Sequence, residues 1–199
     1  MGIFRLKSYT MKKQNIFLIL LIALLNSCTS EEHMIFNNVP MDGTLDKFVS
    51  ELTNSGFIIS DSTKKNEIVL SGEFLNKDCK IYVWATSKDN TVYKVMVELP
   101  GEVPDSLQYS FEEIRKLYSS KYGTGKTRYQ QYRNPERFMF NEPGLKRQIR
   151  KGDRTKYTID SGYITVEVQD GFISITYLDK MNNEIRKMEL EEESKKDID

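Results

Sequence analysis

Apolar residues recur twice along the chain at the spacing of an amphipathic helix, and each time strand-like runs follow. The first helix is predicted between the N-cap residue Thr44 and Gly56, with the apolar residues Leu45, Phe48, Val49 and Leu52 at i, i+3, i+4 and i+7. A second helix is predicted to end at Gly123, and its apolar stripe consists of Phe111, Ile114, Leu117, Tyr118 and Tyr122.

Alternating apolar and polar residues predict short strands after each helix. Turn residues separate these runs, and connections this short suit antiparallel hairpins, because parallel strands need long crossovers. Asp170-Gly171 is a strong tight-turn signal between the last two strands. The predicted strands are 67–74, 79–86 and 91–99 after the first helix, and 137–141, 155–159, 163–168 and 172–178 after the second.

This order predicts an α+β fold of two tandem units, residues 41–100 and 101–180, packed as one globule. In each unit one helix would cover one face of an antiparallel meander. Residues 181–199 form a charged C-terminal extension. Its beginning fits either a helix with Met181, Ile185 and Met188 on one side or a continuation of the sheet, and the acidic end is expected to fray.

The N-terminal segment, residues 1–27, has the pattern of an export signal. It contains four basic residues, no acidic residue and an unbroken apolar run over 16–25. A ten-residue helix spans only about 15 Å, half the roughly 30 Å of a bilayer core. The run is therefore too short for a stable membrane span, and we expect a signal peptide.

The residues that follow the apolar run, Leu25-Asn26-Ser27-Cys28, resemble the lipobox of bacterial lipoproteins. That resemblance implies cleavage before Cys28, acylation of its thiol and attachment of the protein to the outer membrane of a bacterial cell envelope. Residues 28–40 would then be a lipidated tether. Glu31-Glu32 resembles the export signal of surface lipoproteins in Bacteroidota. Display on the cell surface and orientation toward the periplasm remain two alternatives.

A second resemblance concerns the start of the predicted folded body. This stretch resembles the opening of a group of uncharacterised Bacteroidota lipoproteins. The residues that carry the resemblance are Phe36, Val39-Pro40, Asp42-Gly43-Thr44, Phe48, Leu52 and Gly56-Phe57. The doubled order of helix and meander is similar to the beta-lactamase-inhibitor-protein-like architecture, and more distantly to small lipoproteins of the outer-membrane assembly machinery. The resemblance implies a non-catalytic scaffold whose exposed sheet face meets a partner.

The predicted strand 79–86 carries two aromatic residues on one face. Tyr82 and Trp84 alternate with Ile81 and Val83. If the first helix covers the face of Ile81, the two rings point outward and form a candidate binding face for a protein or a glycan. The alternative is that they pack against the second unit as core.

Charge adds one further candidate site. The chain has 29 basic and 29 acidic residues, so its net charge is zero. The overall charge therefore does not indicate a nucleic-acid partner. Residues 121–156, however, contain 11 Lys or Arg and three acidic residues. In an exported protein this segment predicts a patch for an anionic glycan, a lipid phosphate or an acidic protein, with a solubilising loop as the alternative. Its candidate residues are Arg128, Arg133, Arg137, Arg147 and Arg150.

Residues typical of catalysis or metal binding are few. His33 is the single histidine and lies in the predicted tether, where no fixed frame would orient it. Cys79 lies in an apolar strand and is expected to be a buried, inert thiol. We therefore expect no cofactor, no metal and no enzymatic activity. A carboxylate-dependent hydrolase and a structural or assembly lipoprotein are the alternatives.

Overall fold

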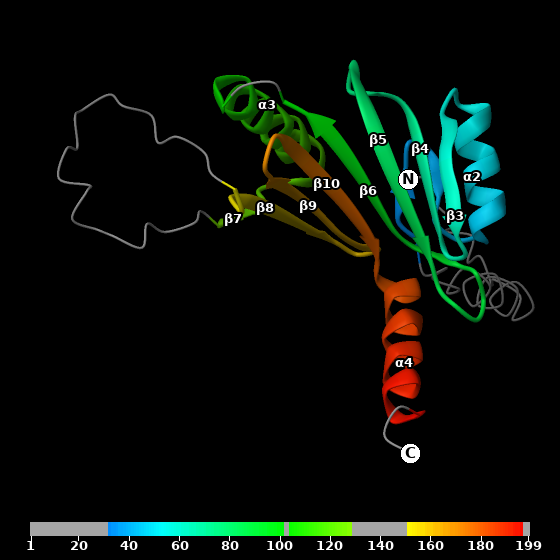
Figure 1. Cartoon of the computed structure of the whole chain (residues 1–199). Coiled ribbons are helices and arrows are strands. Elements are labelled where there is room, and N and C mark those ends of the chain that lie inside the picture. The colour runs from blue at the N-terminus through cyan, green and yellow to red at the C-terminus, as the bar shows by residue number, and fades with distance from the viewer. Residues whose placement is uncertain (1–31, 102–103, 129–150, 197–199) are drawn as a thin grey trace, which may run out of the picture. The chain divides into compact units, whose positions relative to one another are not determined.

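The computed structural model describes residues 32–101, 104–128 and 151–196 (Figure 1). Two short strands, β1 (Ile35–Phe36) and β2 (Val39–Pro40), form a hairpin. The helices are α2 (Leu45–Asn54), α3 (Pro104–Tyr122) and α4 (Lys180–Lys196). The remaining strands are β3 (Ile58–Lys64), β4 (Glu67–Phe74), β5 (Lys77–Ala85), β6 (Val92–Pro100), β7 (Lys126–Arg128), β8 (Arg154–Ile159), β9 (Gly162–Val168) and β10 (Phe172–Asp179).

Strands β3 to β10 form one continuous antiparallel sheet of eight strands, in the order β3-β4-β5-β6-β10-β9-β8-β7. The predicted α+β class is confirmed. We expected a separate sheet for each helix, but β6 and β10 pair from Pro100–Phe172 to Lys94–Leu178 and join the two groups of strands. This pairing satisfies the backbone of two strands rich in buried apolar residues, which would otherwise be open edges.

Helices α2 and α3 cover the same face of the sheet, and the hydrophobic core lies beneath them. Phe48 and Leu52 of α2 and Phe111 and Ile114 of α3 are buried, as the predicted helix stripes require. Leu117, which the predicted stripe of α3 also included, is instead 49% exposed. The strands contribute alternate residues to this core, which is the period of two expected for a sheet with one covered face. These residues include Leu70, Ile81, Val83, Val95, Val97, Ile164, Val166, Ile173 and Ile175.

The N-terminal hairpin belongs to the folded body. Met34, Phe36 and Val39 are buried, and the Phe36 ring contacts the rings of Tyr177 and Phe74 at centroid distances of 5.0 and 5.5 Å. The segment expected to be a tether, residues 28–40, is therefore packed from Met34 onward. The predicted strand 137–141 lies outside the described residues.

The C-terminal extension forms α4, which leaves the end of β10 and projects beyond the sheet (Figure 1). Of the two alternatives, the helix is confirmed, but the expected apolar side is not the buried one. Met188 is 56% exposed, whereas Asn182 and Glu189 are 3% exposed. Asn182 donates to the carbonyl oxygens of Met41 and Val92, at 2.6 and 2.9 Å.

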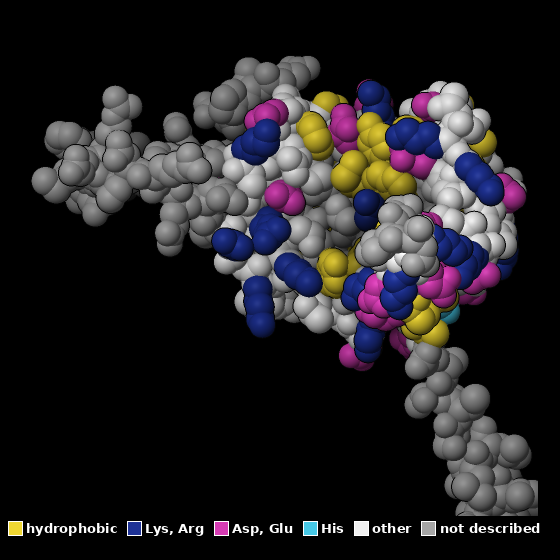
Figure 2. All heavy atoms as spheres, turned by 60° about the horizontal axis from the view of Figure 1, so that its bottom comes forward, with side chains coloured by type: hydrophobic (Ala, Val, Ile, Leu, Met, Phe, Trp, Pro, Cys, Tyr) yellow, Lys and Arg dark blue, Asp and Glu magenta, His cyan; other side chains and the backbone are white. Residues whose placement is uncertain are grey.

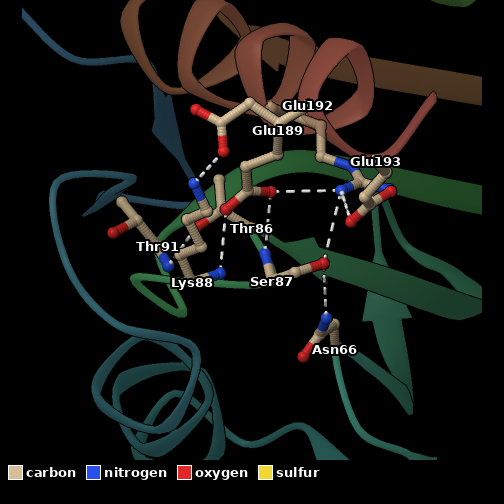
Figure 3. Close-up of polar contacts among 9 residues, drawn as sticks. Asn66, Thr86, Ser87, Lys88, Thr91, Glu189, Glu192 and Glu193 are labelled. Carbon is tan, nitrogen blue, oxygen red and sulfur yellow. Dashed lines mark hydrogen bonds and ion pairs between the residues drawn. The ribbon is translucent and has the colours of Figure 1, made fainter. Parts of the chain in front are cut away.

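Glu189 fastens α4 to the turn between β5 and β6 (Figure 3). Its carboxylate accepts hydrogen bonds from the backbone N–H groups of Ser87 and Lys88, at 2.9 and 2.8 Å, and from the Arg186 guanidinium at 3.1 Å. Burial by itself would raise the pKa of the Glu189 carboxyl, but these donors together lower it. The carboxylate therefore stabilises the folded protein only while it is ionised.

We expect Glu189→Ala to lower the free energy of unfolding by about 2 kcal/mol at pH 7, because two amide donors lose their acceptor. Since the folded-state pKa is lowered, the contribution is complete above about pH 4.3, the ordinary pKa of Glu, and is lost as the pH falls through the lowered value. Urea unfolding between pH 3 and pH 7 measures it. Glu191→Ala, at an exposed position on the same helix, is the control and should leave stability unchanged. Equal losses in both variants would contradict this role of Glu189.

No helix among the described residues is long and apolar enough to cross a membrane.

Candidate functional site

The face of the sheet opposite α2 and α3, here called the open face, is the main candidate site. In the strand register, one row of directly paired residues crosses this face from β4 to β7. The row, here called the central row, begins with apolar and aromatic side chains, continues with two threonines and ends with two lysines. Its members are Val69, Tyr82, Met96, Thr176, Thr165, Lys156 and Lys126. Figure 2 shows one area of apolar side chains bordered by basic and acidic ones, with further basic side chains spread over the same view.

Tyr82 and Trp84 lie on the open face and are partly exposed, opposite the buried Ile81 and Val83. Their rings stack on each other, with centroids 5.8 Å apart and planes 14° apart. The pair does not form a core between two units. The geometry is that of the outward-pointing alternative in the sequence analysis.

Two carboxylates and an ammonium group hold this aromatic pair. The Trp84 indole donates to Glu67 Oε2 at 2.8 Å, and the Tyr82 hydroxyl donates to Glu98 Oε2 at 3.1 Å. Lys94 Nζ lies 3.7 Å from the centroid of the Trp84 ring. Burial, followed by the charge of Glu98, raises the pKa of the Tyr82 hydroxyl, so it remains a donor. The two rings are therefore held in one arrangement in the protein alone, and a surface that is already ordered loses less conformational entropy if it binds.

The structure describes one of the five residues of the predicted basic patch. Arg128 lies on the edge strand β7, whereas Arg133, Arg137, Arg147 and Arg150 lie outside the described residues. The structure brings Arg128 next to Arg154 through the pairing of β7 with β8. The sequence alone did not single out this group, because residues 129–153 separate the two strands along the chain. Its further members are Lys126 and Lys156.

A cavity of about 550 Å³ lies between the N-terminal hairpin and the end of α3. Its lining is mainly apolar and aromatic and includes Ile35, Leu117 and Tyr122. Tyr118 and Tyr177 also line the cavity, and their hydroxyl groups are hydrogen-bonded to each other. Burial raises the pKa of both well above the ordinary value, so both stay protonated at neutral pH and do not act as bases.

His33 lies at the same cavity and is held there, in contrast to the flexible position expected for it. Its Nδ1 is 3.2 Å from Asp179 Oδ2, and that oxygen also accepts the backbone N–H of Met34 at 2.7 Å. Asp179 Oδ1 accepts the N–H of Asn182 at 2.9 Å and so caps α4. The pair thus connects the N-terminal segment, β10 and α4.

Two further kinds of site were considered, a reactive cysteine and a metal centre. Cys79 is a buried free thiol whose pKa is raised to about 11, first by burial and then by Asp78. A thiol of this kind is a poor nucleophile. Within the described part of the chain, no three His, Cys, Asp or Glu residues are grouped as metal ligands. Cys28 lies outside the described residues.

Comparison of the chain with protein-family models, curated protein sequences and solved structures gave no match.

Proposed function

We propose that this chain is a lipid-anchored lipoprotein of a bacterial outer membrane that acts as a non-catalytic binding module and holds a protein or glycan partner on its open face. The observation that carries this proposal is the pre-arranged Tyr82–Trp84 pair on a sheet face that neither α2 nor α3 covers. Tyr, Trp, Met and Arg are the residues enriched at binding interfaces, and this face presents all four.

The proposed membrane attachment rests on the lipobox-like residues that end at Cys28. Within the described residues, His33 and Met34 near the start of the folded body both bind Asp179. Only a few residues thus separate the proposed anchor from the folded body. This arrangement would hold the binding face close to the membrane surface.

We further propose that the fold consists of two tandem units. Helix α2 is followed by β3–β6, and α3 is followed by β7–β10. The two groups meet where β6 pairs with β10. Such a doubling widens the open face, so that a partner larger than one unit can lie across the junction.

Two carboxylates on the open face support binding over hydrolysis. Glu67 accepts a hydrogen bond from Trp84 and also pairs with Lys64 at 2.9 Å, while Glu98 accepts one from Tyr82. A hydrolase needs one carboxylic acid that can donate a proton and a second carboxylate to act as base or nucleophile. These two groups instead serve as acceptors that orient the aromatic rings.

A photo-crosslinking residue placed on the open face tests the proposal. We expect a diazirine amino acid at Thr176, in the middle of the central row, to give one discrete adduct in intact cells. The same amino acid at Lys47, exposed on α2, is the matched control and should give none. Adducts from Lys47 alone, equal adducts from both positions, or no adduct from either would contradict binding on this face.

A further inference from the structure

Four basic residues on β7 and β8 face one another in like-charged pairs. In the antiparallel register Lys126 lies directly opposite Lys156, and Arg128 lies directly opposite Arg154. All four side chains are exposed, and they line the same side of the sheet. Like charges directly opposite each other across two strands are destabilising. This group, here called the cation ladder, therefore costs stability in the isolated protein.

The described part of the chain does little to neutralise this charge. Among the described residues, no carboxylate forms an ion pair with a member of the cation ladder. Glu167 lies opposite Arg154 on β9 and is the one acidic residue in register with it. Lys156 instead lies over the Tyr163 ring, with Nζ 3.6 Å from the centroid.

Protection of the sheet edge against pairing with a foreign strand explains only two of the four residues of the cation ladder. Lysine and arginine on an edge strand hinder the addition of a foreign strand. That reason applies to Lys126 and Arg128, because β7 is the edge. It does not apply to Arg154 and Lys156, because β8 is paired on both sides.

The cation ladder surrounds a shallow hollow of about 340 Å³ that also includes Tyr163 and Thr165. Neighbouring strands are about 4.8 Å apart, and alternate residues of a strand are about 6.8 Å apart. Four charges at this spacing suit several anionic groups better than one. The arginine side chains present planar forks that bind sulfate or phosphate with two hydrogen bonds, and the lysines add point charges.

We infer that the cation ladder binds a glycan chain that carries sulfate or phosphate groups. This inference rests on the proposed function, because it specifies the partner of the same open face. The central row favours a glycan: next to Lys156 come the hydroxyl groups of Thr165 and Thr176, which suit sugar hydroxyls between anionic groups. The ligand would run from the cation ladder toward Met96 and Tyr82.

Binding of dextran sulfate to the detergent-solubilised full chain tests the inference, with uncharged dextran as the reference. We expect the double substitution Arg154→Gln and Lys156→Gln to weaken binding about tenfold at 0.1 M salt and to reduce its salt dependence. The control is the double substitution Lys65→Gln and Lys77→Gln. It removes two exposed charges, one in the β3–β4 turn and one at the start of β5, and should leave the affinity for dextran sulfate unchanged. Near-identical circular dichroism spectra establish that all variants are folded.

Three outcomes would overturn the inference: equal weakening in both double variants, no binding of dextran sulfate, or tighter binding of polyglutamate or of phosphatidylglycerol vesicles through the same residues. If dextran sulfate does not bind while the crosslinked adduct at Thr176 still forms, the assignment of a glycan is wrong, but the proposed function as a binding module is still supported. If the Thr176 adduct is also missing, the proposed function fails with it.

Discussion

Replacing Asp179 with alanine is expected to lower the free energy of unfolding by about 4 kcal/mol, because it leaves two buried backbone N–H donors unpaired at about 1–3 kcal/mol each, one of them at the start of α4. Asp179 is 0% exposed, and its two oxygens accept the N–H groups of Met34 and Asn182. One side chain thus holds three segments that are distant in sequence. A loss of this size is a large share of the stability of a domain.

Urea unfolding followed by Trp84 fluorescence measures this loss. His33→Ala is the matched comparison, because it removes only the partly exposed ring from Asp179 and leaves both backbone donors satisfied. We expect it to cost less than about 1 kcal/mol. A loss below 1 kcal/mol for Asp179→Ala, or equal losses for both variants, would show that the buried carboxylate is not the organising contact.

The elements that local sequence determines were predicted well. The first helix begins after Thr44, whose hydroxyl accepts the N–H of Lys47 at 3.5 Å, and its four stripe residues are all buried. The meander of β4, β5 and β6 and the pair β9–β10 follow clear alternation and turn residues. Tyr82 and Trp84 could be assigned to one face for the same reason, since alternation places them opposite Ile81.

Elements that depend on distant contacts could not be predicted in this way. Every residue of β3 is exposed, so Ile58–Lys64 shows no alternation and no apolar face. Strand β6 pairs with β10, and β7 pairs with β8. Both pairings join segments that are distant in sequence, so no local sequence pattern predicts them. The cation ladder therefore emerged only from the register of the strands.

Helix α4 shows a different limit of pattern recognition. An apolar stripe predicts the buried side of a helix only when burial is driven by apolar surface. Here the buried side contains Asn182 and Glu189. Carbonyl groups of Met41, just after β2, and of Val92 in β6 need partners there, as do N–H groups of the β5–β6 turn. Met188 is left on the solvent side.

Attachment to the membrane is expected to depend entirely on Cys28. Each buried CH₂ of an acyl chain contributes about 0.8 kcal/mol, so two or more chains anchor a protein stably, whereas a protein without them is released. His33, the first residue bound to Asp179, lies five residues after Cys28. An extended chain of that length reaches at most about 17 Å, so His33 would lie no farther than that from an acylated Cys28.

Labelling of cells with radioactive palmitate tests this dependence. We expect Cys28→Ala to abolish labelling and to move the protein from the membrane fraction to the soluble fraction. Cys79→Ala is the matched control: its thiol is buried and its pKa is raised to about 11, so its removal should change neither the label nor the fraction. Label or membrane association that survives in Cys28→Ala would mean that another part of the chain attaches the protein, and the proposed closeness of the open face to the membrane would lose its basis.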